Sequence, residues 1–201
     1  MIGQSVVSQD LSSDLPSRQA DGCAPAPCAS GPGTVYWITG LSAAGKTTVA
    51  TGLCNRLRDA GRTAILLDGD RLRDVLDAGD AFDPADRLRL AMTYARLCRE
   101  LAGQGVDVVC ATISMFHAVR DWNRANIARY REIYLRVPAD VLSRRDPKGI
   151  YARHRSGLQD RVVGRDLAPE LPRNPDLTID NDGAVTPADA VERIWSTQVA
   201  A

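Results

Sequence analysis

Short apolar runs alternate with amphipathic stretches along most of the chain. Runs rich in β-branched, aromatic and other apolar residues predict buried strands at residues 34–39, 64–67, 106–111, 132–137 and 177–179. Apolar positions at helical spacing predict helices over residues 46–60, 83–102, 118–129, 139–144 and 187–198. Because strands and helices alternate throughout, the pattern predicts an α/β fold whose parallel sheet carries helices on both faces.

Two stretches depart from this alternation. Residues 1–33 are rich in Ser, Pro, Gly, Asp and Ala and show no hydrophobic period, so we expect a disordered tail before a folded domain at residues 34–201. The tail lacks the basic start and the apolar stretch of a secretory signal, and we therefore expect a cytoplasmic protein. Residues 146–175 are polar and rich in Pro, Gly and Arg, which predicts a mobile lid with some helix.

Composition narrows the function classes. The formal net charge is zero, with 25 acidic and 25 basic residues, whereas a protein that binds nucleic acid polymers usually carries a basic excess. No apolar run approaches the roughly 18 residues that a membrane helix needs. The five cysteines are expected to be buried or tail thiols, because a metal site would need more ligands than two histidines can add. A small molecule is therefore the expected partner, rather than a nucleic acid polymer or a membrane.

The strongest chemical signal follows the first predicted strand. Residues 40–48, GLSAAGKTT, match the phosphate-binding pattern GxxxxGK[ST] in the strand–turn–helix context that it requires. The glycines let the backbone curl so that main-chain N–H groups face phosphate oxygens, and the N-terminus of the next helix adds a favourable field. This P-loop predicts a nucleotide-phosphate site made of Gly40, Leu41, Ser42, Ala43, Ala44, Gly45, Lys46, Thr47 and Thr48.

Within the P-loop, Lys46 is expected to reach the β- and γ-phosphates, and the hydroxyl of Thr47 to hold Mg²⁺. Only two of the 25 basic residues are lysines, Lys46 and Lys148. A compact ammonium suits a phosphate cradle better than a planar guanidinium does. Lys148 is therefore a second candidate ligand contact, with a solvated lid charge as the alternative.

Two carboxylates, Asp68 and Asp70, follow the second predicted strand, at the strand end where such folds bind ligands. One could accept the proton of an acceptor hydroxyl, and either could orient the magnesium shell; a helix-cap or turn role is the alternative. The sequence has neither an NKxD signature for guanine nor a DxxG motif at residues 68–71, and it is short for a motor ATPase. An ATP-dependent small-molecule kinase is the class that remains.

These residues make the chain resemble the adenylylsulfate kinase family. The matching segments are GLSAAGKTT, LDGDRLR, AFDPADR, ATISMF with the following Arg-Asp pair, RDPKGIY and NPDLTID, and they cover roughly residues 35–194. The resemblance implies a P-loop NTPase-like fold and a role in sulfate assimilation. It also implies that ATP with Mg²⁺ phosphorylates the ribose 3′-hydroxyl of adenylylsulfate (APS) to give 3′-phosphoadenylylsulfate. A homodimer is a further implication, for which the long predicted helix after Asp83 offers a surface.

The family's site residues can be carried over where the motifs match. The resemblance implies that Lys46, Asp68 and Ser114 serve catalysis, with Asp68 on the acceptor side and Ser114 beside the transferring phosphoryl group. It further implies that Arg145 helps hold the adenine of ATP. The remaining acceptor contacts would be Asp70, Arg73, Phe82, which would stack on the base, Arg87 and Lys148. Each has a structural alternative: a solvated helix face for the two arginines, a core position for the phenylalanine and a cap for the serine.

Three positions depart from the family pattern. Leu90 stands where the family usually has Asn, and the segment SMFH ends in His117 where the family reads SPFR or SPYR. Val162 replaces a phenylalanine that completes a two-sided stack on the substrate base. The departures cluster on the acceptor side while the ATP side is intact. The segments SMFH, WNR and VVG resemble a side branch that includes cytidine diphosphoramidate kinases.

The sequence is therefore compatible with three functions. APS is the expected acceptor, and a cytidine nucleotide such as cytidine diphosphoramidate is the alternative within the same enzyme class. A nucleotide-binding module without catalysis is the third, and the intact Lys46, Thr47 and Asp68 argue against it.

Overall fold

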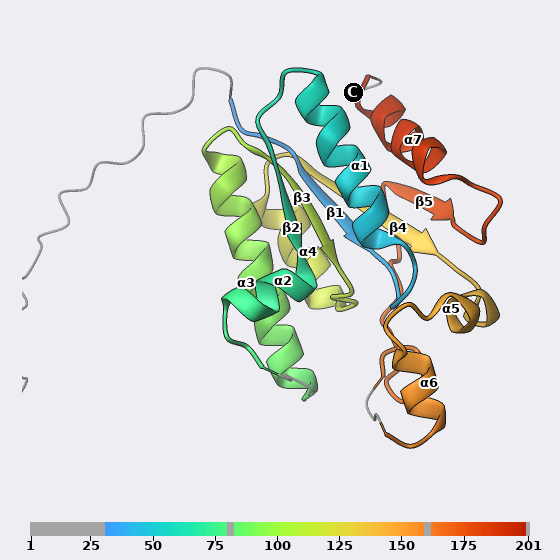
Figure 1. Cartoon of the computed structure of the whole chain (residues 1–201). Helices are drawn as coiled ribbons and strands as arrows, with labels where there is room; N and C mark the ends of the chain where they lie inside the picture. The colour runs from blue at the N-terminus through green and yellow to red at the C-terminus, as the bar shows by residue number, and fades with distance from the viewer. Residues whose placement is uncertain (1–30, 80–82, 159–161, 200–201) are drawn as a thin grey trace, which may run out of the picture.

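The computed structural model describes residues 31–79, 83–158 and 162–199. In chain order the elements are β1 (Val35–Thr39), α1 (Lys46–Asp59), β2 (Ala64–Asp68), α2 (Gly69–Val75), α3 (Pro84–Gly103), β3 (Asp107–Thr112), α4 (His117–Asn126), β4 (Tyr130–Arg136), α5 (Ala139–Arg145), α6 (Ile150–Arg155), β5 (Leu177–Asp180) and α7 (Pro187–Val199). Figure 1 shows the strands running in one direction through the middle of the molecule.

The five strands form a single sheet in the order β2-β3-β1-β4-β5, and every pairing is parallel. The predicted parallel α/β fold is therefore confirmed. β1 lies in the centre, between β3 and β4. The loop that follows β1 consequently begins at the middle of the sheet's carboxyl edge, where ligands bind in folds of this type.

Helices cover both faces of the sheet, and the side chains of β1 show why. Val35 and Trp37 face the cluster that includes α3 and α4, whereas Tyr36 and Ile38 face the cluster that includes α1 and α7. All four are fully buried or nearly so, as expected for a central strand whose successive side chains point to opposite faces. Figure 1 shows α3 and α1 on either side of the strands.

The carboxyl edge of the sheet is flanked by the shorter helices. Figure 1 shows α2 and the start of α3 on one side of this edge and α5 and α6 on the other. α5 corresponds to the short helix predicted at residues 139–144, whereas α6 and the turn around Val163, which bridges to Leu167, occupy the region predicted as a lid. These segments therefore surround the point at which the P-loop leaves the sheet.

Several predicted boundaries shift. α2 was not predicted as a helix, and α4 ends at Asn126 rather than near residue 129 because β4 already begins at Tyr130. Packing of the described chain begins at Gly33. The N–H of Gly33 donates to the carbonyl of Ala102 (2.8 Å). Residues 1–30, which make up most of the predicted tail, lie outside the described residues.

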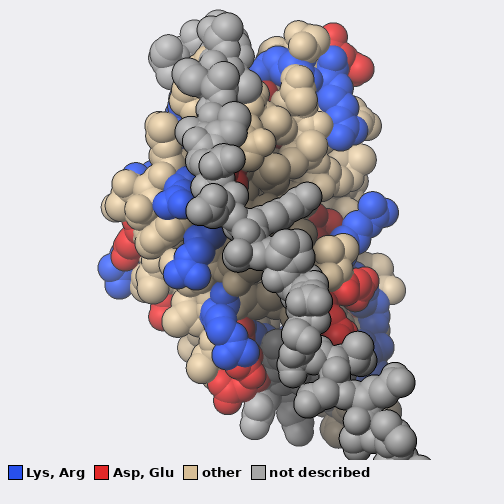
Figure 2. Space-filling model, turned by 90° about the vertical axis from the view of Figure 1, so that its left-hand side faces the viewer, with Lys and Arg blue, Asp and Glu red and all other residues tan. Residues whose placement is uncertain are grey.

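Three of the five cysteines, Cys54, Cys98 and Cys110, are free and buried, as predicted, and the other two lie outside the described residues. Among the described helices, none has the length and apolar character needed to cross a bilayer. On the face that carries α3, basic and acidic side chains are interspersed (Figure 2).

Candidate active site

A cavity of about 1100 Å³ lies at the carboxyl edge of the sheet. Its walls come from the P-loop, α2, α3, the loop after β3 and the lid. The predicted site residues that line it are Ser42, Ala43, Gly45, Lys46, Thr47, Thr48, Asp68, Asp70, Arg73, Arg87, Ser114, Arg145 and Lys148. Gly40, Leu41 and Ala44 belong to the same loop behind this surface, and Phe82 lies outside the described residues. Residues that are far apart in the sequence are thus gathered around one space.

The P-loop curls tightly between β1 and α1. At Gly40 an added Cβ would lie 2.7 Å from the carbonyl oxygen of Leu135, so a side chain there would collide with backbone. Ala43 has φ +63°, which alanine rarely adopts, and Gly45 at the start of α1 has φ +86°. Because two of its residues have positive φ, this turn orients its N–H and C=O groups differently from a loop in which every φ is negative.

Three carbonyl groups of the P-loop accept hydrogen bonds from side chains. Lys46 Nζ donates to the carbonyl of Leu41 (2.8 Å), and the Tyr151 hydroxyl donates to the carbonyl of Ser42 (3.1 Å). Nδ2 of Asn181, which directly follows β5, donates to the carbonyl of Ala44 (2.9 Å). Because the C=O and N–H of a trans peptide point in opposite directions, these bonds direct the N–H groups of the following residues away from the donors.

The ammonium of Lys46 titrates in an unusual range. Burial lowers the pKa of Lys46 to about 8, although the nearby carboxylates of Asp70 and Asp68 oppose this shift. A phosphate group in the cavity would add negative charge close to the ammonium and favour its protonated form. The protonated fraction of Lys46 should therefore rise when a nucleotide binds.

Thr47 of the P-loop contacts Asp68 at the end of β2. The Thr47 hydroxyl donates to Oδ2 of Asp68 (2.6 Å), and Oδ1 accepts from the backbone N–H of Asp70 (3.0 Å), which caps α2. Asp68 thus fulfils the cap alternative and also lines the cavity. Hydroxyl and carboxylate oxygens are the donors that Mg²⁺ prefers, usually completed by substrate phosphates and water. Among the described residues, no cluster of three His, Cys, Asp or Glu side chains could hold a metal ion alone.

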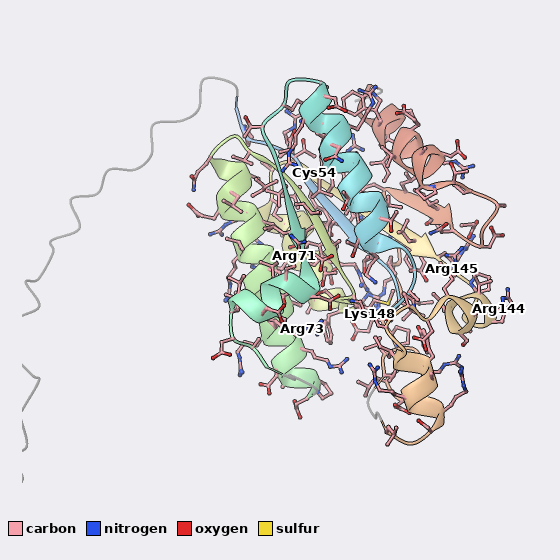
Figure 3. All side chains as sticks on the ribbon, viewed as in Figure 1. Cys54, Arg71, Arg73, Arg144, Arg145 and Lys148 are labelled. Atoms are coloured by element: carbon pink, nitrogen blue, oxygen red, sulfur yellow. The ribbon has the colours of Figure 1, made fainter. Side chains whose placement is uncertain are left out.

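Asp70 connects the two sides of the cavity. Its carboxylate pairs with Arg73 on α2 (2.5 Å) and with Lys148, which lies after α5 (Figure 3). Burial raises the pKa of Asp70, but hydrogen bonding and charge from Lys148, together with Arg73, bring it below its usual value overall. Two of the three cations predicted to contact an anionic acceptor, Arg73 and Lys148, therefore share one carboxylate partner.

The loop after β3 forms another wall. Ser114 has φ +21°, and its hydroxyl lies 2.6 Å from that of Thr112. The hydroxyl of Thr39, at the end of β1, donates to the carbonyl of Ile113 (2.6 Å). These contacts fix Ser114 at the cavity surface, where it is half-buried.

Two of the three departures from the family pattern line the cavity. Leu90 on α3 is half-buried and Val162 in the lid is buried, and both present apolar surface to the space. His117 is not a lining residue; its Nδ1 lies 2.7 Å from Nη2 of Arg120, and its backbone N–H donates to the carboxylate of Glu170.

Other lining or supporting residues were not predicted from the sequence. Arg71, Arg153 and Glu170 line the cavity, and Tyr151 and Asn181 support the P-loop from outside. Tyr151 lies inside the RDPKGIY segment, which signalled a functional region but no role for the tyrosine. Arg71 lies likewise inside the LDGDRLR segment, and the other three carry no sequence signal that distinguishes them from ordinary surface residues.

A known protein family and several individual proteins are similar to this chain in sequence. The family model described as adenylylsulphate kinase matches residues 32–180. An adenylyl-sulfate kinase of Paraburkholderia xenovorans is 40% identical over 151 residues, which are 75% of this chain and 84% of the relative. A cytidine diphosphoramidate kinase of Campylobacter jejuni is 37% identical over 147 residues, which are 73% of this chain and 85% of the relative.

Solved structures show the same likeness. The APS kinase CysC of Mycobacterium tuberculosis, in complex with AMPPNP and APS, matches with a TM-score of 0.78 and 31% identity, covering 84% of this chain and 98% of that one. The two sequence relatives carry the names of the two acceptors that the sequence left open.

Proposed function

Because the chain belongs to the adenylylsulphate kinase family, we propose that it transfers the γ-phosphoryl group of ATP to the ribose 3′-hydroxyl of APS. The products are ADP and 3′-phosphoadenylylsulfate. Membership of the family makes the chain a phosphotransferase with a hydroxyl acceptor and a P-loop for ATP. The identity of the acceptor and the part of each residue belong to the proposal.

The observation that carries the proposal is the junction of Thr47 and Asp68. Their side chains are 2.6 Å apart at the boundary between the P-loop and the acceptor side of the cavity. A group at this point can contact both substrates, so Asp68 accepts the proton of the 3′-hydroxyl and Thr47 orients Mg²⁺. Thr47 and Asp68 would hold Mg²⁺, which would offset the negative charge that develops during phosphoryl transfer.

The charges around the cavity support two anionic substrates. The cationic residues that line it are Lys46, Arg71, Arg73, Arg87, Arg145, Lys148 and Arg153, against the anionic Asp68, Asp70 and Glu170. Such a surplus of positive charge favours polyphosphates and stabilises charge during phosphoryl transfer. Lys46 attracts the outer phosphates of ATP, while Arg73, Arg87 and Lys148 hold the anionic part of the acceptor.

A specific observation favours cytidine diphosphoramidate as a second candidate acceptor. Leu90 and Val162 both line the cavity, at positions where the family usually has an asparagine and a phenylalanine that stacks on the base. A relative of 37% identity is a cytidine diphosphoramidate kinase. Loss of such contacts weakens the recognition of adenine by about 1–3 kcal/mol each, which leaves room for a pyrimidine acceptor.

A turnover comparison tests the proposal. The full chain is incubated with ATP, Mg²⁺ and either APS or cytidine diphosphoramidate, and kcat/KM is measured from ADP release. Mass spectrometry and ³¹P NMR identify the phosphorylated hydroxyl. The proposal expects a higher kcat/KM for APS and phosphate on the 3′-oxygen. A higher value for cytidine diphosphoramidate selects the second candidate, and inactivity towards both removes the two together.

A Lys46→Met variant serves as the control for contaminating kinases. It keeps a long unbranched side chain but loses the charge, so ADP release should fall to background. The cytoplasmic location, the homodimer and the need for Mg²⁺ remain parts of the proposal. Mg²⁺ is tested by chelation with EDTA and by restoring the ion.

A further inference from the structure

Ala43 of the P-loop has a backbone conformation that alanine disfavours. Its φ of +63° places it in the left-handed region, which costs a residue with a Cβ roughly 1–2 kcal/mol. Flipping the peptide that joins Ser42 to Ala43 would change the φ of Ala43 by about 180° and place it in the ordinary extended region. The same rotation would reverse the N–H of Ala43, which lines the cavity. Something must therefore hold this peptide in the orientation that presents its N–H to phosphate.

The Tyr151 hydroxyl makes the contact that opposes this rotation. It donates to the carbonyl of Ser42 at 3.1 Å, and that carbonyl belongs to the same peptide unit as the N–H of Ala43. Because the two groups of a trans peptide point in opposite directions, a bond to the carbonyl fixes the direction of the N–H. Rotation of the peptide would break the bond.

Tyr151 itself is firmly placed. It lies on α6 in the lid, is 3% exposed, and belongs to the core cluster that contains Ala44 and Leu142. The guanidinium of Arg165 lies 5.4 Å from the centre of its ring. Its burial raises the pKa of Tyr151 above its usual value, so the hydroxyl keeps the proton that it donates. Its position is thus set by packing that does not depend on Ser42.

A second lid contact lies beside the first. Gly164 lies so close to Leu41 that an added Cβ would be 3.0 Å from each of the Leu41 δ-carbons. The lid therefore touches two consecutive P-loop residues, through a hydrogen bond at Ser42 and through close packing at Leu41. Both contacts lie where the P-loop leaves β1.

We propose that Tyr151 is a positioning residue for ATP, because its hydroxyl holds the strained Ser42–Ala43 peptide with the N–H of Ala43 facing the phosphates. The inference rests on the proposed function, since it deepens the account of the same nucleotide site. It links the lid to the phosphate cradle: the lid carries the hydroxyl, and the cradle has its binding-competent form while the lid is seated. When the hydroxyl is absent, part of the population has the peptide reversed, and the apparent affinity falls by that fraction.

Tyr151→Phe tests the proposal because it removes only the hydroxyl and keeps the buried ring. We expect the Kd for MgADP, measured by isothermal titration calorimetry, to rise by up to about fivefold, the factor that one hydrogen bond of this kind supplies. KM for ATP should rise by the same factor with kcat unchanged, because the reversed peptide affects binding and not the transfer step. Unchanged Kd and KM would overturn the proposal.

A second substitution tests whether the hydroxyl acts through the strained peptide. Glycine adopts positive φ without the penalty that alanine has, so Ala43→Gly removes the strain that Tyr151 opposes. In the Ala43→Gly background, Tyr151→Phe should raise the Kd less than twofold, and the double-mutant cycle should show coupling. Equal effects of Tyr151→Phe in both backgrounds would mean that the hydroxyl acts independently of the strained peptide, and the proposal would fail.

Tyr134→Phe is the matched control. Tyr134 is a half-buried tyrosine on β4 that is not a lining residue of the cavity, so its variant should bind MgADP as the unaltered chain does. Failure of the unaltered chain to bind MgADP would remove the proposed function and this inference together. Normal binding by the unaltered chain and by all variants would remove this inference alone.

Discussion

Replacing Asp68 by asparagine tests the chemistry of the site with little disturbance of the fold. Asp68 accepts two hydrogen bonds, from the Thr47 hydroxyl (2.6 Å) and from the backbone N–H of Asp70 (3.0 Å). Asparagine keeps one oxygen for the N–H of Asp70, and its amide can donate to the Thr47 oxygen, whose hydroxyl rotates to accept. Asn and Asp are similar helix caps, so the free energy of unfolding should change by less than about 1 kcal/mol.

The loss should therefore fall on the reaction. Asparagine cannot take the proton of the acceptor hydroxyl, and the loss of a positioned general base costs about 10²–10⁴-fold in kcat. That factor corresponds to about 2.7–5.5 kcal/mol of activation free energy. The Kd for MgADP should stay within a few-fold, because the P-loop amides and Lys46 are unchanged.

The assay compares kcat, the Kd for MgADP and the melting temperature of Asp68→Asn with those of Asp83→Asn. Asp83 caps α3 with the same kind of bond, to the N–H of Ala85 at 2.8 Å, and is not a lining residue of the cavity. Asp83→Asn should keep its activity. Full activity of Asp68→Asn would refute the catalytic role of this carboxylate, and a large fall in melting temperature would show that Asp68 is mainly structural.

Three further predictions concern charge, specificity and stability. Affinity for MgATP should fall as the pH rises above about 8, because Lys46 loses its proton there and a neutral amine does not attract phosphate; calorimetric titrations that give a constant affinity from about pH 7 to about pH 9.5 would contradict this. Leu90→Asn should raise the kcat/KM of APS relative to cytidine diphosphoramidate about fivefold by restoring one hydrogen bond, and an unchanged ratio in competition assays would count against Leu90 as a specificity residue. Arg120→Met should lower the free energy of unfolding by about 3 kcal/mol, since Arg120 is buried and pairs with the buried Glu132 (3.3 Å). Its melting temperature should fall by about 6–12 °C, whereas Arg89→Met, at a salt bridge where the arginine is 79% exposed, should leave it nearly unchanged.

The sequence predicted the P-loop well because its determinants are local. Strand, turn and helix follow one another within a few residues, and Lys46 and Thr47 have fixed places in the motif. α2 was missed for an equally local reason. It begins at Gly69, and glycine is a poor helix former, so residues 68–70 looked like a turn; the cap from Asp68 to the N–H of Asp70 starts the helix despite the glycine.

The supports of the P-loop could not be predicted in this way. Tyr151 reaches Ser42, and Asn181 reaches Ala44, across most of the folded chain. Neither tyrosine nor asparagine announces such a partner, because the contact depends on how α6 and the end of β5 are placed in space. The same holds for Arg120, which joins α4 to the backbone of Glu170 at the end of the lid. Helical spacing predicts that this arginine lies on a helix but not that it is buried.

The central place of β1 has a consequence for the order in which the protein acquires its activity. During synthesis β1 emerges before its two neighbours in the sheet, β3 and β4, in which Val108 and Tyr130 pair with Val35. Both edges of β1 therefore stay unpaired until these two strands have been added. Asn181, which steadies Ala44, is added later still. A nascent chain should thus gain the ability to retain nucleotide only after residue 181 has emerged from the ribosome, and ATP binding would report that the sheet is complete.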